Sequence, residues 1–223
     1  MALAATHLRF AHEMFHVLRV KDPSAYYSGT LYPDSRYLTG IKRKLTHEDS
    51  FLFEKKVLQM SDFHKGWWMH LVCDDLQYSA FRFYLRHTDI DLPQKNKVTS
   101  ENTKFLTSTA LKILQDRDDY EKFEVKACLA YVTNFSNPNA EWPDKIEEYY
   151  DIIKALYRKQ PTLSDYMIDL WDKLKVSNAN LLAIHDETKR LMAMPEVMEK
   201  VPKFFGFIEN HFLDLIDELR AIK

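Results

Sequence analysis

Glycine is scarce in this chain, with only 4 among 223 residues. All-β folds need many turn positions with a positive backbone φ angle, and glycine is the residue that adopts this conformation most readily. The abundant leucine, lysine, glutamate and alanine are instead good helix formers. We therefore expect an all-α protein.

Cysteine is nearly absent as well. The two cysteines, Cys73 and Cys128, match no zinc or redox spacing. Both lie within apolar helical patterns, so we interpret them as buried free thiols rather than as a disulfide. That interpretation suits a reducing compartment.

Neither a dominant charge nor a long apolar run is present. The formal net charge of −2 gives no global reason to expect nucleic-acid binding. No apolar stretch approaches the roughly 20 residues that span a bilayer, and residues 1–6 lack a secretory pattern. We expect a cytoplasmic protein with no transmembrane segment, acting on a small molecule or phosphoester, and the sequence leaves a homodimer open.

Helical spacing of apolar residues covers most of the chain. In the first half it predicts a helix from Ala5 to about Val20 with Thr6 as N-cap, a helix from Thr46 to about Met60, and a central helix capped by Ser61-Asp62 that ends near Arg86. Residues 28–37 show neither helical nor strand periodicity and are predicted as a loop.

The second half shows similar spacing, interrupted mainly by proline and asparagine. It predicts helices at about 101–116, 118–135, 144–159, 163–175, 178–193 and 196–221. The whole chain, residues 1–223, is then one all-α domain of about seven to nine helices. Residues 1–87 would form its metal-site half and residues 100–223 its helical C-terminal half, with the polar segment 87–99 between them.

Five residues of the first third have the chemistry of metal ligands. His70 and Asp74 lie one turn apart on the central helix and so share a face; the others are His7, Asp34 and His47. Imidazole nitrogens and carboxylate oxygens suit zinc, iron or manganese, and the lack of thiolate pairs argues against a structural zinc site. A hydrogen-bonded structural pair is the competing interpretation of His70 and Asp74.

Four short segments follow one another in a definite order. They are Thr6-His7, Gly29-Thr30-Leu31-Tyr32-Pro33-Asp34, Thr46-His47 and Gly66-Trp67-Trp68-Met69-His70-Leu71-Val72-Cys73-Asp74. This order resembles that of the zinc-dependent phospholipase C superfamily, which includes single-strand-specific nucleases. Members of that superfamily are all-α metallohydrolases that cleave phosphodiester bonds with clustered zinc ions. The resemblance covers residues 5–75, about a third of the chain.

Carried over by position, the resemblance implies that Asp34, His47, His70 and Asp74 ligate one metal ion. His7 would contribute to a neighbouring ion, with Asp74 bridging the two. The family's further ligands, a later histidine and a second His-x-x-x-Asp/Glu, have no counterpart in this chain. The resemblance therefore implies one or two metal ions or a degenerate site, and not a three-metal site.

These observations predict a metal-dependent hydrolase of a phosphoester or phosphodiester, using a metal-bound hydroxide. Zinc is the favoured cofactor, with iron or manganese as alternatives. Asp34 would take part in catalysis through the metal, and Arg36 and Arg43, with Lys44, are candidates to stabilise a developing oxyanion; solvated loop charges are the competing interpretation. The alternative function is a non-catalytic helical binding or scaffold protein with a degenerate metal site.

Overall fold

The computed structural model describes residues 3–48, 51, 56–87, 100–133, 136–175 and 178–221. Across these ranges all regular elements are helical and no strand occurs, which confirms the predicted all-α fold in a single body. The longer helices are α1 (Ala4–Met14), α2 (Pro23–Leu31), α6 (Asp62–His87), α7 (Ser100–Lys122), α9 (Pro143–Leu156), α11 (Asn178–Met192) and α12 (Pro195–Ala221).

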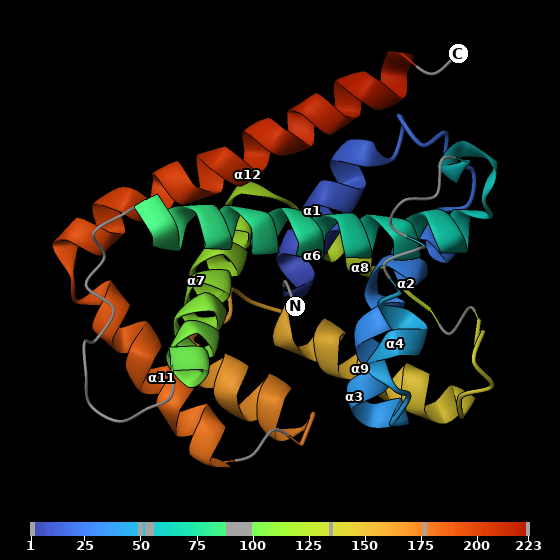
Figure 1. The fold of residues 1–223 in the computed structure, drawn as a ribbon. Helices are drawn as coiled ribbons and strands as arrows, with labels where there is room; N and C mark the ends of the chain where they lie inside the picture. The colour runs from blue at the N-terminus through green and yellow to red at the C-terminus, as the bar shows by residue number, and fades with distance from the viewer. Residues whose placement is uncertain are drawn as a thin grey trace.

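Shorter helical turns connect them. These are η1 (Tyr32–Ser35), α3 (Arg36–Thr39), α4 (Arg43–Thr46), η2 (Val57–Gln59), α8 (Val125–Leu129), α10 (Leu163–Asp165) and the π-helix η3 (Tyr166–Asp172). Helix α6 runs across the middle of the molecule, with α12 on one side of it and α9 on the other (Figure 1). No helix within the described ranges is both long and apolar enough to cross a membrane.

Two of the rare glycines lie where α2 crosses α6. A Cβ atom added to Gly29 would lie 2.0 Å from the Phe63 carbonyl oxygen, and one added to Gly66 would lie 1.9 Å from that of Tyr26. Because no real Cβ contact is that short, the two backbones approach each other only because both positions lack side chains. This close crossing places α2 against the first turns of α6.

The central helix is correctly predicted. Ser61 caps it, since its hydroxyl accepts a hydrogen bond from the His64 amide at 3.3 Å. The side chain of Asp62 accepts hydrogen bonds from the amides of Lys21 and Asp22, both at 2.8 Å. The start of α6 is thereby tied to the connection between α1 and α2.

Several predicted boundaries in the first half are wrong. Helix α1 ends at Met14 rather than near Val20. The predicted loop 28–37 is helical almost throughout, because α2 continues to Leu31 on its packing surface against α6 and η1 and α3 follow directly. The predicted helix start at Thr46 is instead the last residue of α4. Residues 49, 50 and 52–55 of that predicted helix lie outside the described ranges, as do residues 88–99 of the predicted polar boundary.

The second half follows the predictions more closely. Helices α9, α11 and α12 match the predicted segments to within a few residues, and the segment 163–175 is helical with a π-helical part. The predicted break near residue 117 is wrong, because α7 continues to Lys122. Cys73 and Cys128 are buried and free, as predicted.

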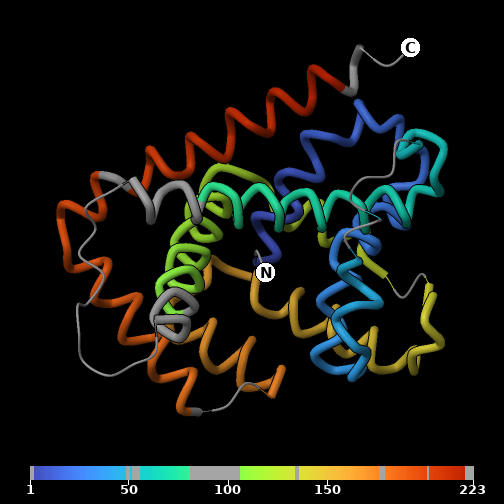
Figure 2. Tube along the Cα trace, viewed as in Figure 1, coloured from blue at the N-terminus to red at the C-terminus, as the bar shows by residue number. Residues whose placement is uncertain are grey.

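The N-terminus of α1 is capped by the other half of the chain. Thr6 is not its N-cap: the helix begins at Ala4 after Leu3, which makes no side-chain cap. The amide of Thr6 donates instead to Asp116 of α7 at 3.1 Å. Asp116 also accepts hydrogen bonds from the hydroxyls of Tyr157 and Tyr166, both at 2.6 Å. A buried carboxylate thus satisfies a helix end that would otherwise lack a partner. Figure 2 traces the two helices that it joins, α1 in dark blue and α7 in green.

The Asp116 carboxylate gives this network a defined pH dependence. Burial raises the pKa of Asp116 to about 6. The hydrogen bonds from Tyr157, Tyr166 and Thr6 lower this pKa but do not outweigh burial. A carboxyl whose folded-state pKa is raised contributes stability that is present below its unfolded pKa and is lost as the pH rises through the folded value. Asparagine cannot titrate. The stability of the wild type relative to Asp116→Asn should therefore fall between about pH 4 and pH 6, by at most about 1.4 kcal/mol per pH unit.

Urea unfolding of both proteins in EDTA, from pH 4 to pH 7.5, measures this difference. Asp116→Asn should also be the less stable protein at every pH, because the amide cannot accept from all three donors. A difference that stays constant across the range would contradict the assignment of Asp116 as a buried, titrating cap.

Candidate metal centre

Four elements bring the five predicted ligands to one place. His7 comes from the first turns of α1, Asp34 from η1, and His70 and Asp74 from successive turns of α6. His47 lies at the C-terminal end of α4, not at the start of a helix as predicted. The three histidines and Asp34 are each at most 8 % exposed, and the side chain of Asp74 is 11 % exposed. The five side chains therefore form one buried cluster.

The spacing inside this cluster is long for hydrogen bonds. The Nε2 atom of His47 lies 3.9 Å from Asp34 Oδ1 and 3.6 Å from Asp74 Oδ2. His70 Nε2 lies 3.9 Å from the same oxygen of Asp74, and His7 Nε2 lies 3.8 Å from its other oxygen. Two ligand atoms that each lie about 2.0–2.2 Å from a common ion are about 3–4 Å apart. The distances therefore suit ligands of one ion better than partners in hydrogen bonds.

The proton positions on two histidines sharpen this point. His70 Nδ1 lies 2.9 Å from the Thr30 carbonyl oxygen, which can only accept, so Nδ1 carries the proton and Nε2 presents a lone pair to the cluster. His47 Nε2 lies 3.3 Å from that lone pair, and His47 Nδ1 lies 2.9 Å from the Thr46 hydroxyl. The Thr46 hydroxyl donates its proton to the Arg43 carbonyl oxygen at 3.3 Å. It therefore accepts a hydrogen bond from Nδ1 of His47, and Nε2 of His47 carries no proton. A proton or a cation must then lie between the two Nε2 atoms.

His7 adds a second polar group that lacks a hydrogen-bond partner. Its ring stacks on that of His70 with 3.8 Å between the centroids and an interplanar angle of 14°. Both of its ring nitrogens are buried without a hydrogen bond, and so is Asp34 Oδ1. Buried polar atoms without partners are costly and rare. A cation at this point would give these atoms the partner that they lack.

Burial keeps the histidines in the form that binds metal. It lowers the pKa of His7 to about 3 and that of His47 to about 2, against the opposing charge of Asp74, and it holds the pKa of His70 well below its usual range. All three are therefore neutral imidazoles at pH 7, with a nitrogen lone pair available.

The two carboxyl groups differ in their titration. Burial, and then the charge of Asp74, raises the pKa of Asp34 to about 7. Burial also disfavours the ionised form of Asp74, yet neighbours that include His70 and Lys112 hold its pKa well below its usual range. At neutral pH Asp74 is therefore ionised, and Asp34 is only partly ionised. A divalent cation bound between them would favour the ionised form of both carboxyl groups.

Within the part of the chain that the structure describes, two overlapping groups of three residues could hold a metal ion. One is His7, His70 and Asp74, and the other is Asp34, His47 and His70, with the ligand atoms of each group within 4.8 Å of one another. No family model, no curated protein and no solved structure matches this chain. The geometry alone therefore supports a metal centre, and membership of the zinc-dependent phospholipase C superfamily remains a resemblance of short segments.

Arg36 and Arg43, the basic residues proposed for catalysis, act on this cluster through their charge. Arg36 donates to the Tyr37 hydroxyl at 2.6 Å and places its guanidinium carbon 4.1 Å from the centroid of the Tyr37 ring. Arg43 and Lys44 are exposed. Burial raises the pKa of Asp34, and the charge of Arg36 lowers it in part. Burial lowers the pKa of His47, and the charge of Arg43 lowers it further. Both arginines therefore act electrostatically on the cluster, and their part in catalysis stays a prediction.

Three functional features escaped the sequence interpretation. The Thr30 carbonyl and the Thr46 hydroxyl orient two of the histidines, in the manner of the outer partners that fix metal-binding imidazoles. Lys112 of α7 places a positive charge near the cluster, where it affects the pKa of Asp34 and Asp74 after larger effects of burial. A backbone carbonyl has no side-chain signature, and the approach of α7 depends on tertiary packing, so neither could be read from local spacing.

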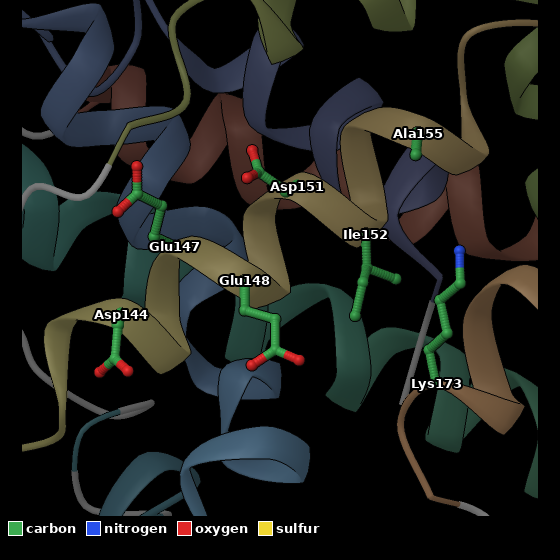
Figure 3. Close-up of a pocket in the computed structure, with 7 residues that line it drawn as sticks. All are labelled: Asp144, Glu147, Glu148, Asp151, Ile152, Ala155 and Lys173. Atoms are coloured by element: carbon green, nitrogen blue, oxygen red, sulfur yellow. The ribbon is translucent and has the colours of Figure 1, made fainter.

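An open hollow of about 700 Å³ on the outer face of α9 is a poor alternative site. Its lining includes four carboxylates, which lie along α9, and Lys173 at one end (Figure 3). The carboxylates belong to Asp144, Glu147, Glu148 and Asp151. A surface of this charge repels a phosphoester, and it contains none of the cluster residues. His185, beside Asp186 on α11, likewise lies outside the cluster and bonds to its neighbour at 3.3 Å.

Proposed function

We propose that this protein is a metal-dependent hydrolase that acts on a phosphoester, with His7, Asp34, His47, His70 and Asp74 as the metal ligands. The observation that supports it most directly is the pair of Nε2 atoms of His47 and His70, which face each other at 3.3 Å beside two carboxylates. A buried group of acceptors in this arrangement is stabilised by a divalent cation. Zinc fits the mixed nitrogen and oxygen ligands, and iron or manganese fits them as well.

The protein's own groups divide into three roles in this proposal. The five ligands fix the position of the metal, which when bound would supply a Lewis acid and an activated water. The Thr30 carbonyl and Thr46 hydroxyl orient His70 and His47. Arg36 and Arg43 attract the anionic substrate and stabilise negative charge that develops on its phosphoryl oxygens.

Metal analysis of protein purified without a chelating column tests the first part of this proposal. We expect at least about one equivalent of a transition metal per chain, because two groups of three possible ligands overlap at the neutral imidazole of His70. Less than about 0.2 equivalents, unchanged after incubation with zinc, iron or manganese, would contradict a metal centre. Hydrolysis of bis(p-nitrophenyl) phosphate by the loaded protein, compared with His47→Ala, then tests the activity.

A structural metal site in a helical scaffold is the second candidate function. The burial of the cluster favours it, because only the side chain of Asp74 is more than one-tenth exposed among the five ligands. In that case the loaded protein binds metal and gains thermal stability but hydrolyses neither phosphodiesters nor phosphomonoesters. Two results together would support this second function: metal no longer raises the thermal stability of His47→Ala, and the wild type shows no measurable hydrolysis.

A further inference from the structure

A hollow of about 350 Å³ lies between α7 and the α11–α12 region, and its lining includes none of the metal-cluster residues. Its size falls within the range of small-molecule sites in proteins. The lining residues are Leu114, Arg117, Asp118, Glu121, Lys122, Met192, Met198, Val201, Pro202, Phe205, Gly206 and Glu209. Apolar side chains supply much of this lining, and charged residues supply the rest.

The apolar part of the hollow is built to stay open. Gly206 lies in the interior of α12, where glycine costs about 0.5–1 kcal/mol relative to alanine. A Cβ atom added there would meet no other atom within 4 Å. Met192 and Met198 are 43 % and 38 % exposed, and their flexible side chains adapt well to a ligand chain. Space and adaptable apolar surface are therefore both present.

Most charges of the hollow already have partners. Lys122 pairs with Asp118 at 2.7 Å. Glu209 pairs with Arg9 at 2.6 Å, and Glu121 accepts a hydrogen bond from the Gln160 side chain. Each of these charged groups therefore already has a partner within the protein.

Arg117 is different from these residues. Among the described residues it has no hydrogen bond or ion pair, and its Nε atom is buried without a partner. The side chain is only partly exposed. A partly buried guanidinium whose Nε donor lacks a partner, beside apolar surface, is suited to a carboxylate that carries an apolar chain, because Nε and a terminal nitrogen can bind both carboxylate oxygens at once.

We propose that this hollow binds a single-chain amphipathic carboxylate of the fatty-acid type, with its head group on Arg117 and its chain over Met192, Met198 and Phe205. A carboxylate fits better than a doubly charged phosphate, because Glu121, whose partner Gln160 is uncharged, lies at the same hollow and repels additional negative charge. The volume suits a chain of about eight to ten carbons. This site is independent of the metal centre and of the hydrolase activity.

Calorimetric titration of the full chain with decanoate, below its micellar concentration, tests the proposal. We expect saturable binding to the wild type and at least about tenfold weaker binding to Arg117→Gln, because the charged hydrogen bonds to the carboxylate are lost. Arg158→Gln is the matched control: it removes an exposed arginine that does not line the hollow, and decanoate should bind it as it binds the wild type. Gly206→Leu, which keeps Arg117 but fills the hollow, should also abolish binding.

Decanol and decylamine separate the head group from the chain. Both should bind at least about tenfold more weakly than decanoate, since neither can accept two hydrogen bonds from the guanidinium. Equal binding of decanoate to Arg117→Gln and to the wild type, equal binding of decylamine, or no saturable binding of decanoate would each overturn the proposal. So would binding of vesicles containing anionic lipid without binding of free decanoate. Circular dichroism of each variant verifies that its helices are intact.

Discussion

Replacing Gly66 by alanine is expected to destabilise the protein by about 3 kcal/mol or more, the range of severe overpacking. The new methyl group would lie 1.9 Å from the Tyr26 carbonyl oxygen and 2.8 Å from the Thr30 amide, both backbone atoms that no rotamer change can move. Helices α2 and α6 must therefore separate. Thr30 and His70 lie on the two sides of this contact, so their 2.9 Å hydrogen bond should lengthen or break.

Two measurements separate the consequences of this substitution. Urea unfolding reports the loss of stability, and zinc affinity should fall by about 10- to 100-fold because His70 loses the carbonyl that orients it. Gly206→Ala is the matched control, since that glycine is also helical but its Cβ would meet nothing within 4 Å. It should stabilise the protein by about 0.5–1 kcal/mol and leave zinc affinity unchanged. A Gly66→Ala protein as stable as the wild type would contradict the close helix crossing.

The second large effect is expected for His70→Ala, which should abolish tight metal binding. His70 is the one residue shared by both groups of three that could hold an ion. His7→Ala removes a ligand from one group and leaves Asp34, His47 and His70 intact. We therefore expect zinc affinity to fall by at least about 100-fold in His70→Ala and by less in His7→Ala.

Isothermal titration with zinc, after removal of metal by EDTA, measures this order. His64→Ala provides the control on the same helix, because His64 bonds to Ser61 at 2.7 Å and lies outside the cluster. It should retain the zinc affinity of the wild type. If His70→Ala binds zinc as tightly as the wild type does, the cluster is a structural polar network and the proposed function is wrong.

The sequence predicted the composition of the cluster better than its surroundings. His70 and Asp74 could be assigned to one face because a four-residue spacing on a long helix has a single geometric outcome. The conformation around Asp34 and His47 was predicted wrongly, since both follow from how α2 packs on α6 and from the short turn of α4. Glycine at positions 29 and 66 was visible in the sequence, but a close helix crossing depends on two segments that are distant in the chain.

The fold shows the same division between local and distant effects. The long helices α6, α9, α11 and α12 follow directly from apolar periodicity and from proline, serine and asparagine near their ends. The start of α1 does not, because its partner is Asp116, more than a hundred residues away in the chain. Local cap rules selected Thr6 as the nearest suitable side chain, whereas the folded protein uses that residue's amide as a donor to another helix.

The capping of α1 by α7 has a consequence for how the protein is made. His7 is synthesised more than a hundred residues before Asp116, and still earlier than Tyr157 and Tyr166, the groups that hold its helix in place. The segment that contains His7 is therefore synthesised well before the partners that fix its helix. Translation order and assembly order are opposite at this point, so metal should be retained only after the later helices have docked.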